Sequence, residues 1–141
     1  MQWLKDFTAQ ATTMLNQFNN ANFKNATMAV CALVAAADGA VSPEEKTKVA
    51  GLIAKNEMLS VFNAGELRTS FLGYCDMAGD EFSRIDLLNI VRKLKSNEAQ
   101  ADTALKVALI IANADGTFDD SEKKVVAELC GVLGLPSSNY L

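Results

Sequence analysis

The chain is 141 residues long, carries a formal net charge of −4 and is 50% hydrophobic, which fits one domain with a continuous core and argues against disorder. Acidic residues outnumber lysine and arginine by 17 to 13, so the composition argues against a nucleic-acid-binding protein. The longest apolar stretch, residues 28–37, is about half of the ~20 residues that a bilayer span requires, so we expect no direct membrane insertion.

Apolar residues spaced three and four apart predict amphipathic helices along the whole chain. Ser42, Pro43 and Glu45 have the pattern of a complete capping box at the start of one of them, and Asn63 is the expected cap of the next. The predicted helices cover residues 4–18, 23–38, 42 to 56–58, 63–75, 85–95, 96–114 and 119–133, with a short helical turn at 59–62. These patterns predict a compact all-α bundle of about seven helices in a single domain, 1–141.

The cysteines are odd in number and widely spaced. Cys31, Cys75 and Cys130 form no Cys-x-x-Cys pair, and the chain contains no histidine. Zinc sites of the usual Cys/His kind and histidine-based catalytic triads are therefore excluded. Each cysteine lies within an apolar helical stripe, which predicts buried packing residues rather than redox-active thiols.

A helix–turn–helix motif occurs twice, in residues 28–54 and 105–131, at an offset of 77. In both copies, one residue separates the Asp-Gly pair from an apolar residue, which is followed directly by Ser or Asp. Two further residues then precede a Glu-Lys pair. The identities are Val30, Ala35, Ala37, Asp38, Gly39, Glu45, Lys46, Val49, Ala50 and Leu52, which match Val107, Ala112, Ala114, Asp115, Gly116, Glu122, Lys123, Val126, Ala127 and Leu129. Because ten identities fall at the same helical phases, we interpret the pattern as an internal repeat.

Each copy matches the second half of an EF-hand loop. When the glycine takes the sixth position, Glu45 and Glu122 fall at the twelfth, where a calcium loop has its bidentate glutamate. The first and third positions, however, are Val34 and Ala36 in one copy and Ile111 and Asn113 in the other. Neither copy can therefore supply the six to eight oxygens of a calcium site alone.

Two copies that face each other could pool their ligands. The predicted metal site consists of four carboxylates and two assisting oxygens: Asp38, Glu45, Asp115, Glu122, Ser42 and Asp119. Such an all-oxygen set suits a divalent cation, namely calcium, magnesium or manganese. Two alternatives stay open: the glutamates can be explained as capping-box residues without any metal, and the acidic turns can form a docking surface for a basic partner segment.

Together, the Ala37-Asp38-Gly39 turn, the Ser42–Lys46 helix start and the second copy at 114–123 resemble the tellurite-resistance protein TerB family. The resemblance implies an all-α fold of about seven helices, acidic residues that bind metal, and membership of a bacterial stress-response system. It also implies partners among other tellurite-resistance proteins, including the membrane protein TerC.

These observations predict a tellurite-resistance and stress-response module that binds a divalent cation and docks onto partner proteins. The alternative is a purely structural interaction scaffold with no metal. We do not expect an enzyme, because no nucleophile–base pair, phosphate-binding loop or cofactor fingerprint is visible. The expected location is the cytoplasm, with recruitment to the inner face of the membrane by a partner.

Overall fold

A computed structural model describes residues 3–114, 116 and 118–141 of the chain. Within these residues the chain forms seven α-helices, two short 3-10 helices and no strand, which confirms the predicted all-α class. The elements are α1 (Leu4–Gln17), α2 (Ala21–Ala35), α3 (Pro43–Lys55), η1 (Glu57–Val61), α4 (Ala64–Ala78), α5 (Glu81–Arg92), α6 (Glu98–Ala114), α7 (Asp120–Leu133) and η2 (Ser137–Asn139).

Polar caps and one glycine set most of the helix boundaries. The Asn63 side chain accepts a hydrogen bond of 3.0 Å from the Glu66 N–H, so it caps α4 as predicted. Gly134 ends α7 in the left-handed conformation, with φ 72° and ψ 30°, immediately before Leu135 and Pro136. The predicted end of α2 is wrong by about three residues, because regular helix stops at Ala35 and the chain continues as a turn.

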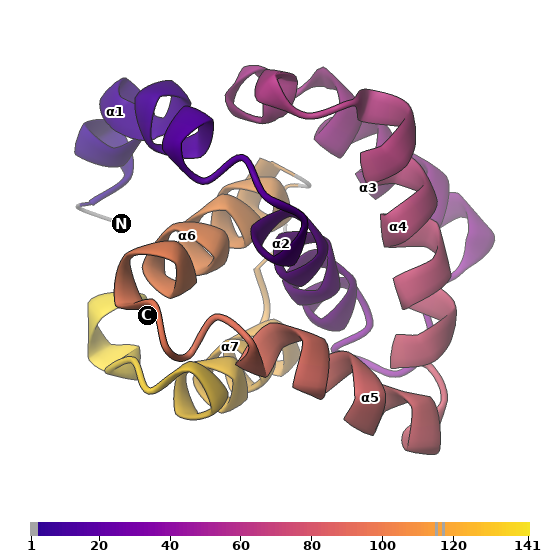
Figure 1. The fold of residues 1–141 in the computed structure, drawn as a ribbon. Helices are drawn as coiled ribbons and strands as arrows, with labels where there is room; N and C mark the ends of the chain where they lie inside the picture. The colour runs from indigo at the N-terminus through magenta and orange to yellow at the C-terminus, as the bar shows by residue number, and fades with distance from the viewer. Residues whose placement is uncertain (1–2, 115, 117) are drawn as a thin grey trace.

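Helix α2 occupies the centre of the molecule (Figure 1). It packs most extensively against α4 and α6 and also contacts α5 and α7. Phe23 and every residue from Ala26 to Val34 are buried, so α2 is apolar on all sides, as expected for a helix surrounded by others. The three buried cysteines belong to the same core, which confirms their predicted burial.

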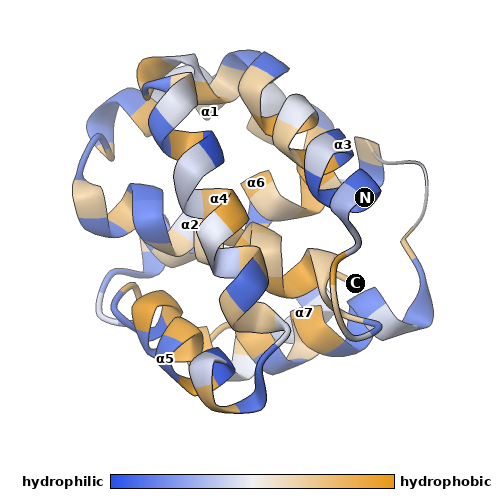
Figure 2. Cartoon of the chain, turned by 90° about the vertical axis from the view of Figure 1, so that its right-hand side faces the viewer, coloured by the Kyte–Doolittle hydropathy of each residue, from blue (hydrophilic) through white to orange (hydrophobic). Residues whose placement is uncertain are grey.

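The outer helices are amphipathic, with hydrophilic and hydrophobic residues alternating along their length (Figure 2). On α5, Leu87 and Val91 are fully buried. Ile85, an apolar residue of the same helix, is 58% exposed, and Phe82 is 80% exposed. Two positions separate Ile85 from Leu87, which is about 200° of helical rotation, so the two side chains cannot face the same core.

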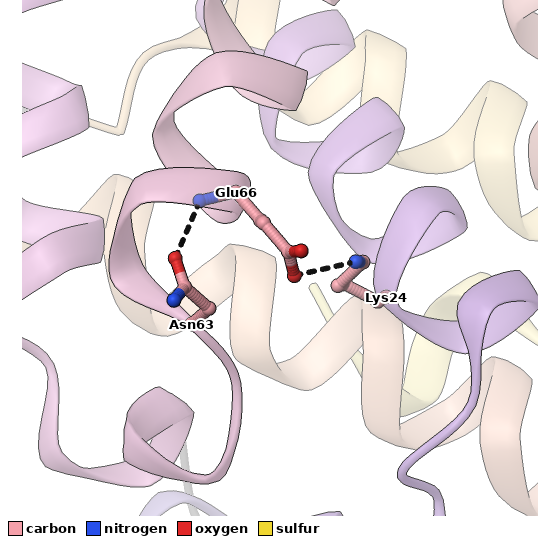
Figure 3. Close-up of polar contacts among 3 residues, drawn as sticks. All are labelled: Lys24, Asn63 and Glu66. Atoms are coloured by element: carbon pink, nitrogen blue, oxygen red, sulfur yellow. Dashed lines mark hydrogen bonds and ion pairs between the residues drawn. The ribbon is translucent and has the colours of Figure 1, made fainter.

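Ion pairs connect helices that are distant in sequence. Lys24 of α2 lies 3.2 Å from the Glu66 carboxylate of α4 (Figure 3). The backbone N–H of Glu66 also donates a hydrogen bond to the Asn63 side chain. Arg84 of α5 makes a two-pronged contact with Glu128 of α7, at 2.5 and 3.1 Å. These contacts connect α2 to α4 and α5 to α7.

The two copies of the repeat correspond to α2–α3 and α6–α7. Helix α2 packs against both α6 and α7, while α6 packs against both α2 and α3. This reciprocal pattern is the one expected when two similar helix–turn–helix units face each other. The fold therefore places the second helix of each copy against the first helix of the other, which is the arrangement that a shared site requires.

Candidate binding pocket

The glycine of each Asp-Gly motif adopts a backbone conformation that favours glycine. Gly39 has φ +127° and Gly116 has φ +93°, and an added Cβ would meet no atom within 4 Å at either position. In both turns the glycine N–H donates to a carbonyl three residues earlier, that of Ala36 at 2.9 Å or Asn113 at 3.1 Å. Backbone strain rather than lack of space therefore explains why glycine recurs.

The two helix starts that follow these turns differ. In the second copy, the Asp119 carboxylate accepts from the Glu122 N–H at 2.9 Å and the Glu122 carboxylate accepts from the Asp119 N–H at 3.1 Å, which completes the capping box. In the first copy, the Ser42 hydroxyl accepts from the Glu45 N–H at 3.2 Å, and only this half of the box forms. The predicted complete box at Ser42 is therefore wrong, and capping does not account for the Glu45 carboxylate.

A pocket of about 260 Å³ lies between the two copies. Its lining includes five of the six predicted site residues: Asp38, Ser42, Glu45, Asp119 and Glu122. Five pairs of lining residues are related by the repeat offset: Cys31 and Ala108, Val34 and Ile111, Ala35 and Ala112, Ser42 and Asp119, and Glu45 and Glu122. The structure thus brings together equivalent positions from both copies. A metal site that takes ligands from both copies requires this arrangement.

Aspartate 115, the sixth predicted site residue and the equivalent of Asp38, lies outside the described residues. Its role as a ligand stays a prediction. Among the five that are described, Glu122 is half-buried, whereas Asp38, Ser42, Glu45 and Asp119 are exposed at the pocket rim.

The pocket is acidic at the rim and apolar at the floor. No lysine or arginine occurs among the described lining residues, which include four carboxylates. The floor consists of buried side chains: Cys31, Val34, Val41, Val49, Ala108 and Ile111. Sequence reasoning found the acids but missed the floor, although the repeat offset that pairs Val34 with Ile111 was a usable signal. The combination suits a positively charged group in contact with apolar surface.

The polar side chains at the pocket rim are carboxylates and one hydroxyl, and oxygen ligands of this kind suit a hard cation. The residues described here do not form a ready-made metal centre, however. No group of three or more His, Cys, Asp or Glu side chains among residues 3–114, 116 and 118–141 is close enough to hold an ion. Binding of a cation would therefore require the exposed rim side chains to move together or water to complete the coordination shell.

The thiols contribute packing rather than reactivity. Burial raises the pKa of Cys31 and of Cys75 to about 12, and that of Cys130 to about 11. Because the thiolate is the nucleophile, these cysteines are poorly reactive near neutral pH in the folded chain. Cys31 is thus a neutral part of the pocket floor.

The fold and the pocket together define an all-helical module with a duplicated acidic helix–turn–helix motif. The family model described as tellurite resistance protein TerB matches residues 24–140. A tellurium resistance protein TerB from Alcaligenes sp. is 30% identical over 103 residues, covering 71% of this chain and 84% of that protein. The chain therefore belongs to the TerB family.

The match begins at Lys24, so it leaves out α1 and includes both copies of the repeat. No solved structure gives a significant match to the chain. None of the helices in the described part of the chain is long and apolar enough to cross a membrane.

Proposed function

We propose that this chain is a tellurite-resistance module that binds a divalent cation in the pocket between its two acidic turns and docks onto partner proteins without catalysing a reaction. Family membership supports the connection to tellurite resistance. The single observation that carries cation binding is that equivalent acidic positions of both copies, Glu45 and Glu122, line one pocket.

The cation would be calcium, magnesium or manganese, because the available donors are carboxylate and hydroxyl oxygens. Asp38, Glu45 and Glu122 would supply charge from both copies, with Ser42 and Asp119 assisting. A bound cation would offset the repulsion among carboxylates that share the pocket. It would thereby hold the two helix–turn–helix units together.

Thermal unfolding tests this proposal. At a cation concentration of a hundred times the dissociation constant, binding stabilises the fold by ~2.7 kcal/mol, which corresponds to a rise in Tm of roughly 8–13 °C for a chain of this size. The melt is measured in EDTA and then with calcium, magnesium or manganese, with ionic strength matched by potassium chloride. A Tm that no divalent cation raises above the potassium control contradicts cation binding.

A matched pair of variants locates the effect. Glu45 lines the pocket, whereas its exposed neighbour Glu44 does not, although both lie in the first turn of α3. Glu45→Gln should remove at least half of the cation-induced rise in Tm, and Glu44→Gln should leave it unchanged. An equal loss in both variants would place the cation outside the pocket.

The proposed partners are other tellurite-resistance proteins, including the membrane protein TerC, with the chain cytoplasmic and recruited to the inner face of the membrane. Binding of purified partner segments is measured in EDTA at low and at high salt. Charge-driven docking should weaken with salt and in Asp38→Asn. Docking that persists in EDTA while no cation raises Tm supports the alternative, an interaction scaffold without metal.

A further inference from the structure

The floor of the pocket has no use in cation coordination. A divalent cation contacts oxygen ligands at 2.0–2.6 Å, and the buried Val34, Val49 and Ile111 side chains offer none. The pocket volume of about 260 Å³ also exceeds that of a ~150 Å³ apolar cavity that admits benzene. The pocket therefore offers apolar surface beside its acidic rim, and a group with both an apolar part and a positive charge can use the two together.

Among protein side chains, lysine and arginine combine an aliphatic stem with a cationic head. Arginine fits this rim better, because its planar guanidinium can bond two carboxylates or one carboxylate twice, and it is less strongly hydrated than an ammonium group. The rim offers carboxylates from both copies, including Asp38 and Glu45 on one side and Glu122 on the other. No lysine or arginine of the described chain lines the pocket.

We infer that the pocket is a docking site for an arginine side chain of a basic partner segment, whose stem crosses the apolar floor and whose guanidinium lies among the rim carboxylates. This inference rests on the proposed role of the pocket in binding a positively charged group. It adds a regulatory consequence: the arginine and a divalent cation use the same carboxylates, so each weakens the binding of the other, and the effect is reciprocal.

The test uses n-butylguanidinium, a mimic of the arginine side chain, added to the full chain in metal-free buffer with EDTA. Methyl NMR signals of Val34, Val49 and Ile111 should shift in a saturable manner, whereas that of Ile85, exposed on α5, should not. Shifts that are equal at Ile85 and at the pocket methyls, or absent from the pocket, overturn the inference.

Two smaller probes separate the charge from the stem. Methylguanidinium has the charge without the stem, and n-butanol has the stem without the charge. Because burial of each methylene strengthens binding severalfold, n-butylguanidinium should bind at least about fivefold more tightly than methylguanidinium. It should also bind more tightly than n-butylammonium and n-butanol. If methylguanidinium binds equally well, the floor plays no part and the inference fails.

Variants of the rim and of the floor complete the design. Glu45→Gln should weaken n-butylguanidinium binding and Glu44→Gln should not. Ala112→Leu, at a half-buried helical position of the lining, should narrow the pocket and block the probe. Should Ala112→Leu fail to fold, as judged by circular dichroism, the two glutamate variants still decide the outcome.

Competition distinguishes this inference from the proposed cation site. Saturating calcium or magnesium, added in excess of the EDTA, should displace n-butylguanidinium from the pocket methyls, which supports both. A cation-induced rise in Tm without any binding of n-butylguanidinium overturns the docking inference and leaves the cation proposal standing. Pocket binding of n-butylguanidinium without any effect of cations on Tm supports docking and contradicts the cation proposal.

Discussion

The first and second copies of the repeat share a turn but use their polar residues differently. In the second copy, Asp119 and Glu122 bond each other's backbone N–H and fix the start of α7. In the first copy, Ser42 alone caps α3, and the capping box does not use the Glu45 carboxylate. The same motif therefore serves mainly to hold a helix start in one copy and leaves a carboxylate at the pocket rim in the other.

The lysine that follows the glutamate diverges in the same way. Lys46 reaches Asp76 of α4 at 2.7 Å, so it ties the first copy to a neighbouring helix. Lys123 lies 4.0 Å from Asp120 within its own helix. The second copy is instead anchored to α5 through Glu128, whose equivalent in the first copy is Gly51. Identical residues thus do not imply identical contacts.

The largest change in the free energy of unfolding is expected at the turn glycines, which both copies share. Gly39→Ala should cost about 1–3 kcal/mol, because an L-residue is strained at φ +127° even though its Cβ would meet no atom. Gly51→Ala, in the interior of α3 and also with open space around the added Cβ, should stabilise the fold by about 0.5–1 kcal/mol. Urea unfolding measures both changes, and equal signs would contradict this account of the turn.

A smaller effect should separate the two helix starts. Asp119→Ala removes the cap of a complete box and should destabilise the chain by about 1–2 kcal/mol, whereas Ser42→Ala should cost about 0.5–1 kcal/mol. The comparison uses urea unfolding in EDTA, so that any bound cation does not contribute. A larger loss in Ser42→Ala than in Asp119→Ala would reverse the proposed division between the copies.

The smallest change in stability is expected from the ion pair between Arg84 and Glu128, which has no equivalent in the first copy. The bond from Arg84 lowers the pKa of the Glu128 carboxyl below its ordinary value. The stability that this pair contributes is therefore present above pH ~4.5 and is lost as the pH falls through the lowered pKa. Because both side chains are partly exposed, we expect only about 0.5–1 kcal/mol.

The check is urea unfolding of the parent chain and Glu128→Gln at pH 7 and in acid. The parent should be the more stable at pH 7, and the difference should shrink in acid, where the Glu128 carboxyl becomes protonated. A difference that stays constant across this range would show that the ionised pair contributes nothing.

Much of the fold follows from local patterns in the sequence. Helical periodicity predicts about seven helices, and the structure confirms the cap at Asn63 and the predicted end of the last helix at residue 133. The errors have physical causes. The end of α2 depends on how the chain turns toward α3. The exposed Ile85 shows in addition that a strongly apolar residue can lie on the side of α5 away from the core. Hydrophobicity alone does not determine which face of a short helix is buried.

For the site, the acids could be predicted but the pocket could not. Counting along the repeat selected Asp38, Glu45 and Glu122, and the structure places all three at one pocket. The floor depends on how α2 and α6 meet, and this packing is a long-range property that spacing within one copy does not contain. The cation itself stays a prediction, because the carboxylates of the described residues do not converge on a single point.

The paired lining of the pocket has a consequence for how the site can vary. In a symmetric dimer of identical chains, one substitution would alter both walls of such a site at once. Here the two walls are encoded 77 residues apart, so Ser42 can differ from Asp119, and Cys31 from Ala108. Each wall can therefore change without the other, and the pocket can suit a ligand whose two ends are chemically unlike.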